Sequence, residues 1–158
     1  IAAPVLEVGK PEASPKERAV EGDRLMIVIV AGGRNLVSTR EISLAVEELL
    51  LKLGAEAVVS GCARGGDAIG EQAAFALGLT VLKYPAVWVI PDSNGTVDRT
   101  AGFKRNEQMA QVADALIALP GGRGTDDMVR RAIRKGMPVY RMDLEGRYWQ
   151  CAPEGWDA

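Results

Sequence analysis

One nine-residue stretch carries the clearest chemistry in this sequence. Residues 119–127, LPGGRGTDD, place three glycines, an arginine and a threonine between an apolar run and a helical pattern. Glycine lets a backbone approach a ligand closely, and a helix that opens at Thr125 would present N–H groups without internal partners. Those groups and the positive end of the helix dipole favour an anion, phosphate above all. The stretch predicts a phosphate-binding turn; the plain alternative is a tight turn that holds no ligand.

Two other loops share this composition, AGGRN at 31–35 and SGCARGGD at 60–67. A longer connection, from Tyr84 through Trp88 to AGFKRN at 101–106, is expected at the same edge. Arginine complements phosphate because its planar guanidinium binds two oxygens at once. Arg123, in the first stretch, is a further arginine beside these loops. Trp88 is predicted either to stack on a base or to cover the end of the sheet. The residues that we predict to bind the ligand and its phosphate are Gly32, Gly33, Arg34, Ser60, Gly61, Arg64, Gly65, Asp67, Arg105, Asn106, Gly121, Gly122, Gly124 and Thr125.

Several carboxylates accompany these loops, namely Asp67, Glu71, Glu107, Asp126 and Asp127. Glu71 follows Asp67 by one helical turn, so both are predicted to point at the same edge. Asp126 and Asp127 fall in a first helical turn, where a carboxylate stabilises the helix through its dipole without any ligand.

The absence of histidine excludes several kinds of site. With His 0, the chain has no Ser-His-Asp or Cys-His system and no HExxH zinc site. Neither glycine loop matches GxxxxGK[ST], and no GxGxxG follows the first apolar run, so triphosphatase and dinucleotide redox sites are not supported. We predict no metal site and no certain cofactor; a bound nucleotide, phosphate or sulfate is the expected ligand.

Hydrophobic periodicity predicts alternating strands and helices. A helix at 38–54 has a capping-box pair, Ser38 and Glu41, and a closing Gly54. The alternation predicts an α/β fold, a Rossmann-like three-layer α/β/α arrangement with a mostly parallel sheet of about five or more strands. The loops at the carboxyl ends of its strands would then share one edge. Strands are expected at 25–31, 56–61, 79–85, 114–122 and 137–143, and further helices at 66–78, 101–113 and 125–136.

The chain divides into three parts. Residues 1–23 are predicted to be a flexible leader, with an ordered segment that packs on a partner subunit as the alternative. Residues 24–143 are predicted to form the nucleotide-binding domain. Residues 144–158 are predicted to be a tail that packs on the domain or on a partner. Leu44 and Leu51 lie off the buried stripe of the first helix, which favours a homodimer.

Composition narrows the partners. The 158 residues have net charge −2 and are 47% hydrophobic, which makes a dedicated nucleic-acid binder unlikely, and no apolar run is long enough for a membrane span. The two cysteines are far apart and no signal-peptide pattern is present, so we expect a cytoplasmic protein. Because the chain begins with Ile1 and not Met, we expect a fragment or a processed form.

With these motifs, the chain resembles the SLOG superfamily, which groups DprA-like DNA-processing proteins, the LOG phosphoribohydrolases (once called lysine decarboxylases) and YpsA/YspA-related proteins. LOG enzymes carry PGGxGTxxE, which Pro120, Gly121, Gly122, Gly124 and Thr125 match. The YspA-type branch is more similar, through VAGGRN, VVSGCARGGDAIGEQAA, YPAVW, AGFKRNEQMA and GGRGTDDMVRRA, over about residues 25–141. The resemblance implies a Rossmann-like fold, a nucleotide-derived ligand and a homodimer.

One departure bears on activity. Met128 stands where LOG enzymes have their catalytic Glu, and a thioether can neither accept a proton nor stabilise a positive anomeric carbon. Arg105 matches the arginine that LOG enzymes use. We therefore expect a nucleotide-binding or nucleotide-sensing protein. The alternative is an N-glycosidic hydrolase, a LOG-like phosphoribohydrolase, with Arg105, Asp127 and Glu71 as catalytic candidates and Asp67 as a further carboxylate. A DprA-type single-stranded DNA protein is the third hypothesis.

Overall fold

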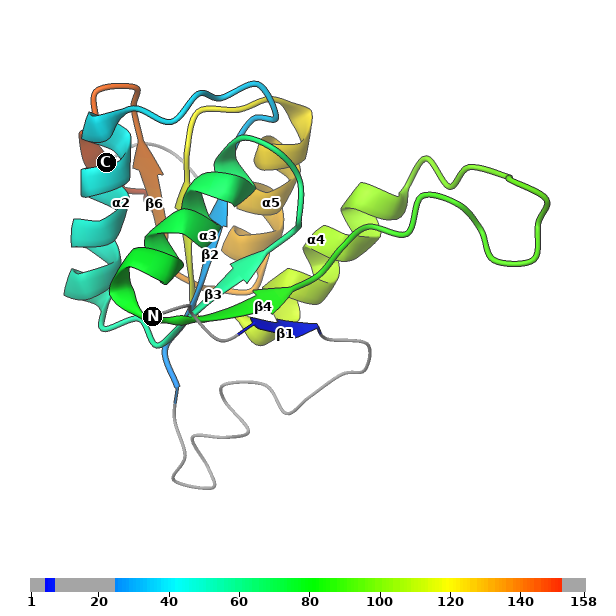
Figure 1. Ribbon diagram of the computed structural model, residues 1–158, viewed down its shortest axis with the longest axis horizontal. Helices are drawn as coiled ribbons and strands as arrows, with labels where there is room; N and C mark the ends of the chain where they lie inside the picture. The colour runs from blue at the N-terminus through cyan, green and yellow to red at the C-terminus, as the bar shows by residue number, and fades with distance from the viewer. Residues whose placement is uncertain (1–4, 8–24, 152–158) are drawn as a thin grey trace.

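The protein is an open, twisted sheet between two helical layers (Figure 1). The computed structural model describes residues 5–7 and 25–151. Seven described strands form one sheet in the order β1-β4-β3-β2-β5-β6-β7, parallel except for the antiparallel β6–β7 pair. The predicted fold class, a Rossmann-like α/β/α arrangement with a mostly parallel sheet, is confirmed.

The elements alternate as the periodicity predicts. The helices are α2 (Arg40–Leu53), α3 (Gly66–Leu77), α4 (Ala101–Val112) and α5 (Arg123–Arg134). The strands are β1 (Val5–Glu7), β2 (Ile27–Ala31), β3 (Ala57–Ser60), β4 (Thr80–Lys83), β5 (Ala115–Ala118), β6 (Val139–Met142) and β7 (Tyr148–Gln150). The chain builds outward from β2 through β3 to β4 and then returns to the other side of β2. The loops after β2 and β5 therefore flank the topological switch point, where ligands bind in such sheets.

Two apolar layers hold the sheet. Val28 and Val30 of β2 pack with α2 and α3, whereas Ile27 and Ile29 pack with α4 and α5. All four side chains are almost completely buried. Burial on both faces explains why the central strands read as continuous apolar runs and do not alternate. No helix within residues 5–7 and 25–151 has the length and apolar character to cross a bilayer.

Helix ends differ in detail from the sequence prediction. The N-cap of α2 is Thr39, whose Oγ1 accepts the Ile42 N–H at 3.2 Å, so the predicted Ser38–Glu41 capping box is wrong by one residue. Ser38 shares a hydroxyl hydrogen bond with Ser43 instead, because the helix starts later. The C-terminal cap at Gly54 is confirmed; its φ of 68° is the left-handed conformation that glycine favours.

Both predicted end segments contain a strand that the sequence did not reveal. β1 lies within the predicted leader and pairs with β4, so the expectation of a flexible chain is wrong for these residues. β7 lies within the predicted tail and closes the opposite edge beside β6. Each has only three residues, too few for a period to show. The rest of the leader and residues 152–158 lie outside the described residues.

Between β4 and α4 the chain makes a long excursion, residues 84–100, which we call the arm. It extends beyond the rest of the fold (Figure 1). A single bridge, between Val89 and Val97, and two backbone hydrogen bonds join its two halves. Val87, Trp88, Val89, Ile90 and Val97 are all exposed on it. The arm leads directly into the N-terminus of α4, so it positions the start of that helix.

Three loops at the carboxyl edge contact one another through their backbones. The Gly33 N–H donates to the Pro120 carbonyl at 2.9 Å, and the Gly66 N–H donates to the Gly33 carbonyl at 3.1 Å. These bonds connect the loop after β2 to the start of α3 and to the loop after β5. A Cβ at Gly66 would overlap the Gly32 backbone, whose carbonyl carbon would lie 2.8 Å away. Glycine at this position is therefore required by packing between loops.

The Gly66→Ala substitution tests this contact. We expect it to lower the free energy of unfolding by about 2 kcal/mol or more, because the added methyl overlaps backbone atoms of the facing loop, which can be relieved only by a shift of that loop. Chemical denaturation monitored by circular dichroism measures the change. Gly124→Ala is the matched control, because nothing lies within 4 Å of the added carbon and its helical position favours alanine by up to about 1 kcal/mol. Equal stability of the two variants would contradict the packing argument.

Candidate functional site

A cavity opens where the loops after β2 and β5 meet the first turns of α3, α4 and α5. Its volume of about 350 Å³ falls in the range of small-molecule sites; we call it the main cavity. The predicted residues that line it are Gly32, Gly33, Arg34, Asp67, Arg105, Asn106, Gly122, Gly124 and Thr125. The fold thus brings together residues from all the loops whose composition suggested phosphate binding.

The N-terminus of α5 forms one wall of this cavity. The helix begins at Arg123, two residues earlier than the sequence predicted, and its N-cap is Gly122, which has no side chain to accept a hydrogen bond. The first helical bond runs from the Asp126 N–H to the Gly122 carbonyl at 3.0 Å. No acceptor among the described residues contacts the N–H groups of Arg123, Gly124 or Thr125. These donors and the helix dipole together favour a bound anion.

The space in front of this terminus is open. Cβ atoms added at Gly122 and Gly124 would meet nothing within 4 Å. Gly121 differs, because its added Cβ would lie 2.7 Å from the Gly33 nitrogen. Gly121 therefore serves the contact between loops, and Gly122 and Gly124 leave room for a ligand to approach the backbone.

Arginine dominates the charge of the main cavity. Arg34, Arg99, Arg105 and Arg123 line it, and Asp67 is the one carboxylate among its lining residues. The Arg34 guanidinium lies over the Trp88 ring, 5.6 Å from the centroid, a cation–π arrangement that holds both side chains at the rim. The cavity therefore has an excess of positive charge.

Arg105 is the most constrained of these arginines. Its Nη1 donates to the Gly61 carbonyl at 2.5 Å and its Nε donates to the Asn106 Oδ1 at 3.1 Å. Burial lowers the pKa of Arg105, and the nearby Asp67 carboxylate opposes that shift. An arginine remains charged under such conditions, so a fixed cation stands between the loop after β3 and the helix α4.

Asp67 is buried, with 7% of its surface exposed. The Ala63 N–H donates to its Oδ2 at 3.1 Å. Burial raises the pKa of Asp67, and the Ala63 N–H and Arg105 partly offset that rise. Asp67 is therefore the carboxylate that can accept a hydrogen bond from a ligand hydroxyl or exchange a proton with the ligand in this cavity.

The structure corrects the positions expected for Asp127 and Glu71, since neither lines the cavity. Asp127 is buried between α4 and α5, where it accepts from Asn106 at 3.0 Å and from the Arg131 Nε at 2.8 Å. Glu71 accepts from the Ser60 hydroxyl, which in turn accepts the Cys62 N–H at 3.0 Å. Both carboxylates have internal partners because the helices that carry them turn these faces toward the protein.

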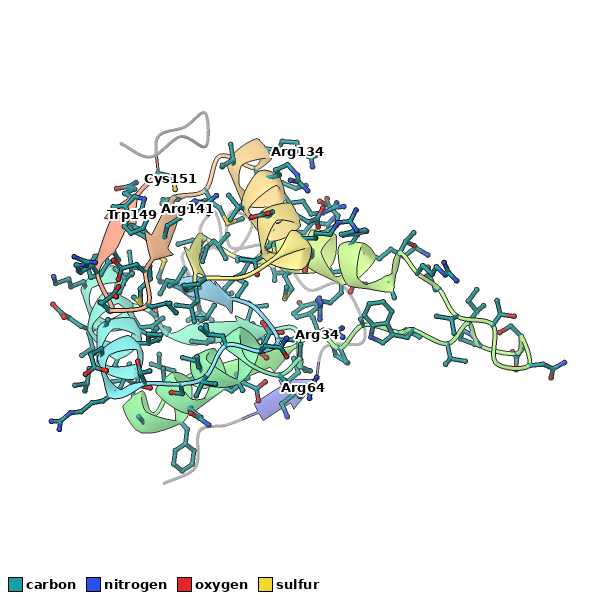
Figure 2. The ribbon with its side chains drawn as sticks, turned by 90° about the horizontal axis from the view of Figure 1, so that it is seen from above. Arg34, Arg64, Arg134, Arg141, Trp149 and Cys151 are labelled. Carbon is teal, nitrogen blue, oxygen red and sulfur yellow. The ribbon has the colours of Figure 1, made fainter. Side chains whose placement is uncertain are left out.

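Five predicted ligand residues do not line the main cavity: Gly121, described above, and Ser60, Gly61, Arg64 and Gly65. Ser60 is completely buried, and Gly65 has φ 72° and closes on the Gly33 carbonyl. Gly61 and Arg64 line a second cavity of about 340 Å³, which we call the side cavity. Figure 2 shows the labelled Arg34 and Arg64 near each other and well apart from Arg134 at the far end of α5.

Sequence reasoning missed several residues that line the main cavity. Arg99, Gly102 and Phe103 come from the end of the arm and the first turn of α4, and Met109 from further along that helix. Arg99, Gly102 and Phe103 fall within the connection from Tyr84 to AGFKRN that the sequence places at this edge, but none of the four was named there as a ligand residue. Met128 also lines the cavity and is 1% exposed, so this part of the wall offers a thioether and no carboxylate. In the described ranges no three His, Cys, Asp or Glu side chains cluster as metal ligands would.

Comparisons with known proteins support the fold. No family model matches the chain, and no curated protein matches it. DNA processing protein A (DprA) from Streptococcus pneumoniae is similar in structure, with TM-score 0.58 and 20% identity, over 77% of this chain and 53% of that protein. DprA from Helicobacter pylori, whose single-stranded DNA binding mode has been described, has TM-score 0.54 and 21% identity, over 74% of this chain and 65% of that one. This chain therefore matches between half and two thirds of those proteins, and the likeness shows a common fold.

The Gly124→Ala variant also tests the anion site. We expect affinity for inorganic pyrophosphate to fall about 10-fold or more, because the methyl group occupies the space through which a phosphate reaches the α5 N–H groups. Isothermal titration of the wild type and the variant measures the change. Since Gly124→Ala is expected to keep or raise stability, a loss of affinity would be specific to the site. Unchanged affinity would place the anion elsewhere.

Proposed function

We propose that this protein binds a nucleotide or a nucleotide derivative as a sensor or carrier. The observation that carries the proposal is the uncapped N-terminus of α5, which opens into a cavity with four arginines and one carboxylate. In this proposal the phosphate lies against the N–H groups of residues 123–125, with Arg34 and Arg123 beside it. This arrangement combines the dipole, free donors and guanidinium groups, which are the three features that favour phosphate.

The rest of the cavity suits a nucleoside. Asp67 is the acceptor for a ribose hydroxyl, and Trp88 and Phe103 offer aromatic faces to a base. Glu71 does not line this cavity and accepts from the Ser60 hydroxyl. The likeness to DprA supports membership of the SLOG superfamily, and the YspA-type motifs support that branch. The exposed Leu44 and Leu51, at 53% and 66%, support the expected homodimer.

N-glycosidic hydrolysis remains the alternative, and it now depends on Asp67. Cleavage needs a carboxylate within reach of the anomeric carbon, and Asp127 and Glu71 both lie outside the cavity lining. Met128 supplies no proton acceptor at the wall where LOG enzymes have theirs. The scarcity of carboxylates in the cavity lining therefore favours ligand binding over hydrolysis.

Single-stranded DNA binding is a second candidate. The Helicobacter pylori DprA gives it support, and the arginines beside the exposed Trp88 resemble a surface on which a base could stack. The net charge of −2 and the 5% aromatic content weigh against a long basic groove. Filter retention of a labelled oligothymidylate that weakens steeply with salt would establish this candidate; no retention at low salt would dismiss it.

A thermal-shift experiment tests the main proposal. Adenine, guanine and uracil mononucleotides are each titrated, and one of them is expected to raise the melting temperature by roughly 5–10 °C at 100 times its Kd. Arg123→Ala should at least halve that shift, because it removes a cation beside the phosphate. Arg134→Ala, at the opposite end of the same helix and outside the cavity, should leave the shift unchanged. Absence of a shift with every nucleotide would rule the proposal out.

A product assay separates binding from hydrolysis. We expect no free base when the wild type is incubated with mononucleotides and the mixture is analysed by liquid chromatography, because Asp67 is the one carboxylate that lines the main cavity and the Met128 thioether in its wall accepts no proton. If base is released and Asp67→Asn abolishes the release, the hydrolase alternative holds. Asp127→Asn is the control; in that case it should keep activity if it keeps its fold, since its carboxylate contacts Asn106 and Arg131 away from the cavity.

A further inference from the structure

The side cavity adjoins the main cavity and shares part of its wall. Both are lined by Arg34, Ala63, Trp88 and Arg105. Each has the volume of a small-ligand site, about 350 Å³ for the main cavity and 340 Å³ for the side cavity. A ligand bound in the main cavity can therefore extend into the side cavity while it stays in contact with the protein.

Arg105 stands at the boundary between the two cavities. Its Nη1 is held by the carbonyl of Gly61, which lines the side cavity. Its Nη2 lies near Gly102, which lines the main cavity; a Cβ placed there would be 3.7 Å from that nitrogen. One guanidinium thus reaches toward both sides, as a group that binds a bridging phosphate would.

Arginines supply all the charged side chains that line the side cavity. Arg34, Arg64 and Arg105 line it, and no Asp or Glu does. In the described part of the chain no carboxylate forms an ion pair with Arg34 or Arg64. Burial raises the pKa of the Cys62 thiol, so that side chain adds no anion. A second negatively charged group from the ligand would complement this cluster.

We propose that the ligand is a nucleotide with two phosphates in a diphosphate bridge, one half in each cavity. This inference rests on the proposed function. The nucleoside half lies in the main cavity with its phosphate at α5. The second phosphate lies beside Arg105 and Arg64, and the group attached to it packs against Pro85, Ala86 and the face of Trp88. The ligand class is therefore a diphosphate-linked nucleotide, such as a nucleotide sugar, rather than a mononucleotide.

A ligand series tests the proposal. Titration calorimetry compares AMP, ADP and ADP-ribose, with the corresponding guanine and uracil series so that the choice of base does not decide the result. We expect the diphosphate-linked member of the preferred base to bind at least 10-fold more tightly than the diphosphate, and the diphosphate more tightly than the monophosphate. Each step adds a group that reaches one more part of the side cavity.

Two variants locate the effect. Arg64→Ala should reduce affinity for the diphosphate-linked nucleotide about 10-fold and leave the monophosphate unchanged, because Arg64 lines only the side cavity. Arg123→Ala should weaken every member of the series, and Arg134→Ala none. Equal affinity for the monophosphate and the linked nucleotide would overturn this inference while nucleotide binding stands. Equal affinity for the diphosphate and the linked nucleotide would also overturn it, since the second half would then contribute nothing. No binding by any member would overturn the proposed function as well.

Discussion

The close backbone contact between the three loops at the carboxyl edge is the constraint on which the site depends. Gly33 is central to it: its carbonyl accepts from Gly66 and its N–H donates to Pro120. Such an approach is open only to residues without a Cβ, because side chains at Gly66 or Gly121 would overlap the facing backbone. Some of the glycines that suggest a ligand site therefore hold the loops together. Others, Gly122 and Gly124, leave the space into which a ligand can come.

This contact has an electrostatic consequence. It brings Arg34, from the loop after β2, and Arg123, from the start of α5, to the lining of one cavity. Like charges so placed repel one another, and the α5 dipole adds further positive potential at the same point. Asp67 offsets only part of this charge, since it is the one carboxylate in a lining that holds four arginines. An anion with several oxygens satisfies all of these groups together, which is the physical basis of the nucleotide proposal.

The arm adds aromatic and basic groups that the compact part of the fold does not supply. Trp88 and Arg99 both line the main cavity, although Trp88 lies early on the arm and Arg99 at its end. Trp88, which contacts Arg34, also lines both cavities, so the arm contributes to the wall that they share. The cavity is thus bounded by loops that backbone hydrogen bonds connect to one another and by an arm whose halves are joined by one bridge and two backbone hydrogen bonds.

The sequence by itself determined the layered fold and the chemical character of the edge, because apolar periodicity and glycine–arginine clusters are local properties of the chain. It correctly placed Arg34, Arg105 and Thr125 at one cavity, since loops after parallel strands must meet. Only the tertiary structure decided which carboxylate reaches that cavity: Asp127 turns toward Arg131 and Glu71 toward Ser60, and Asp67 alone remains. The sequence places a residue on a helix, but the direction of its side chain depends on the neighbours that pack against it. The edge strands β1 and β7 were not predicted for the same reason, because each forms by pairing with another segment of the chain.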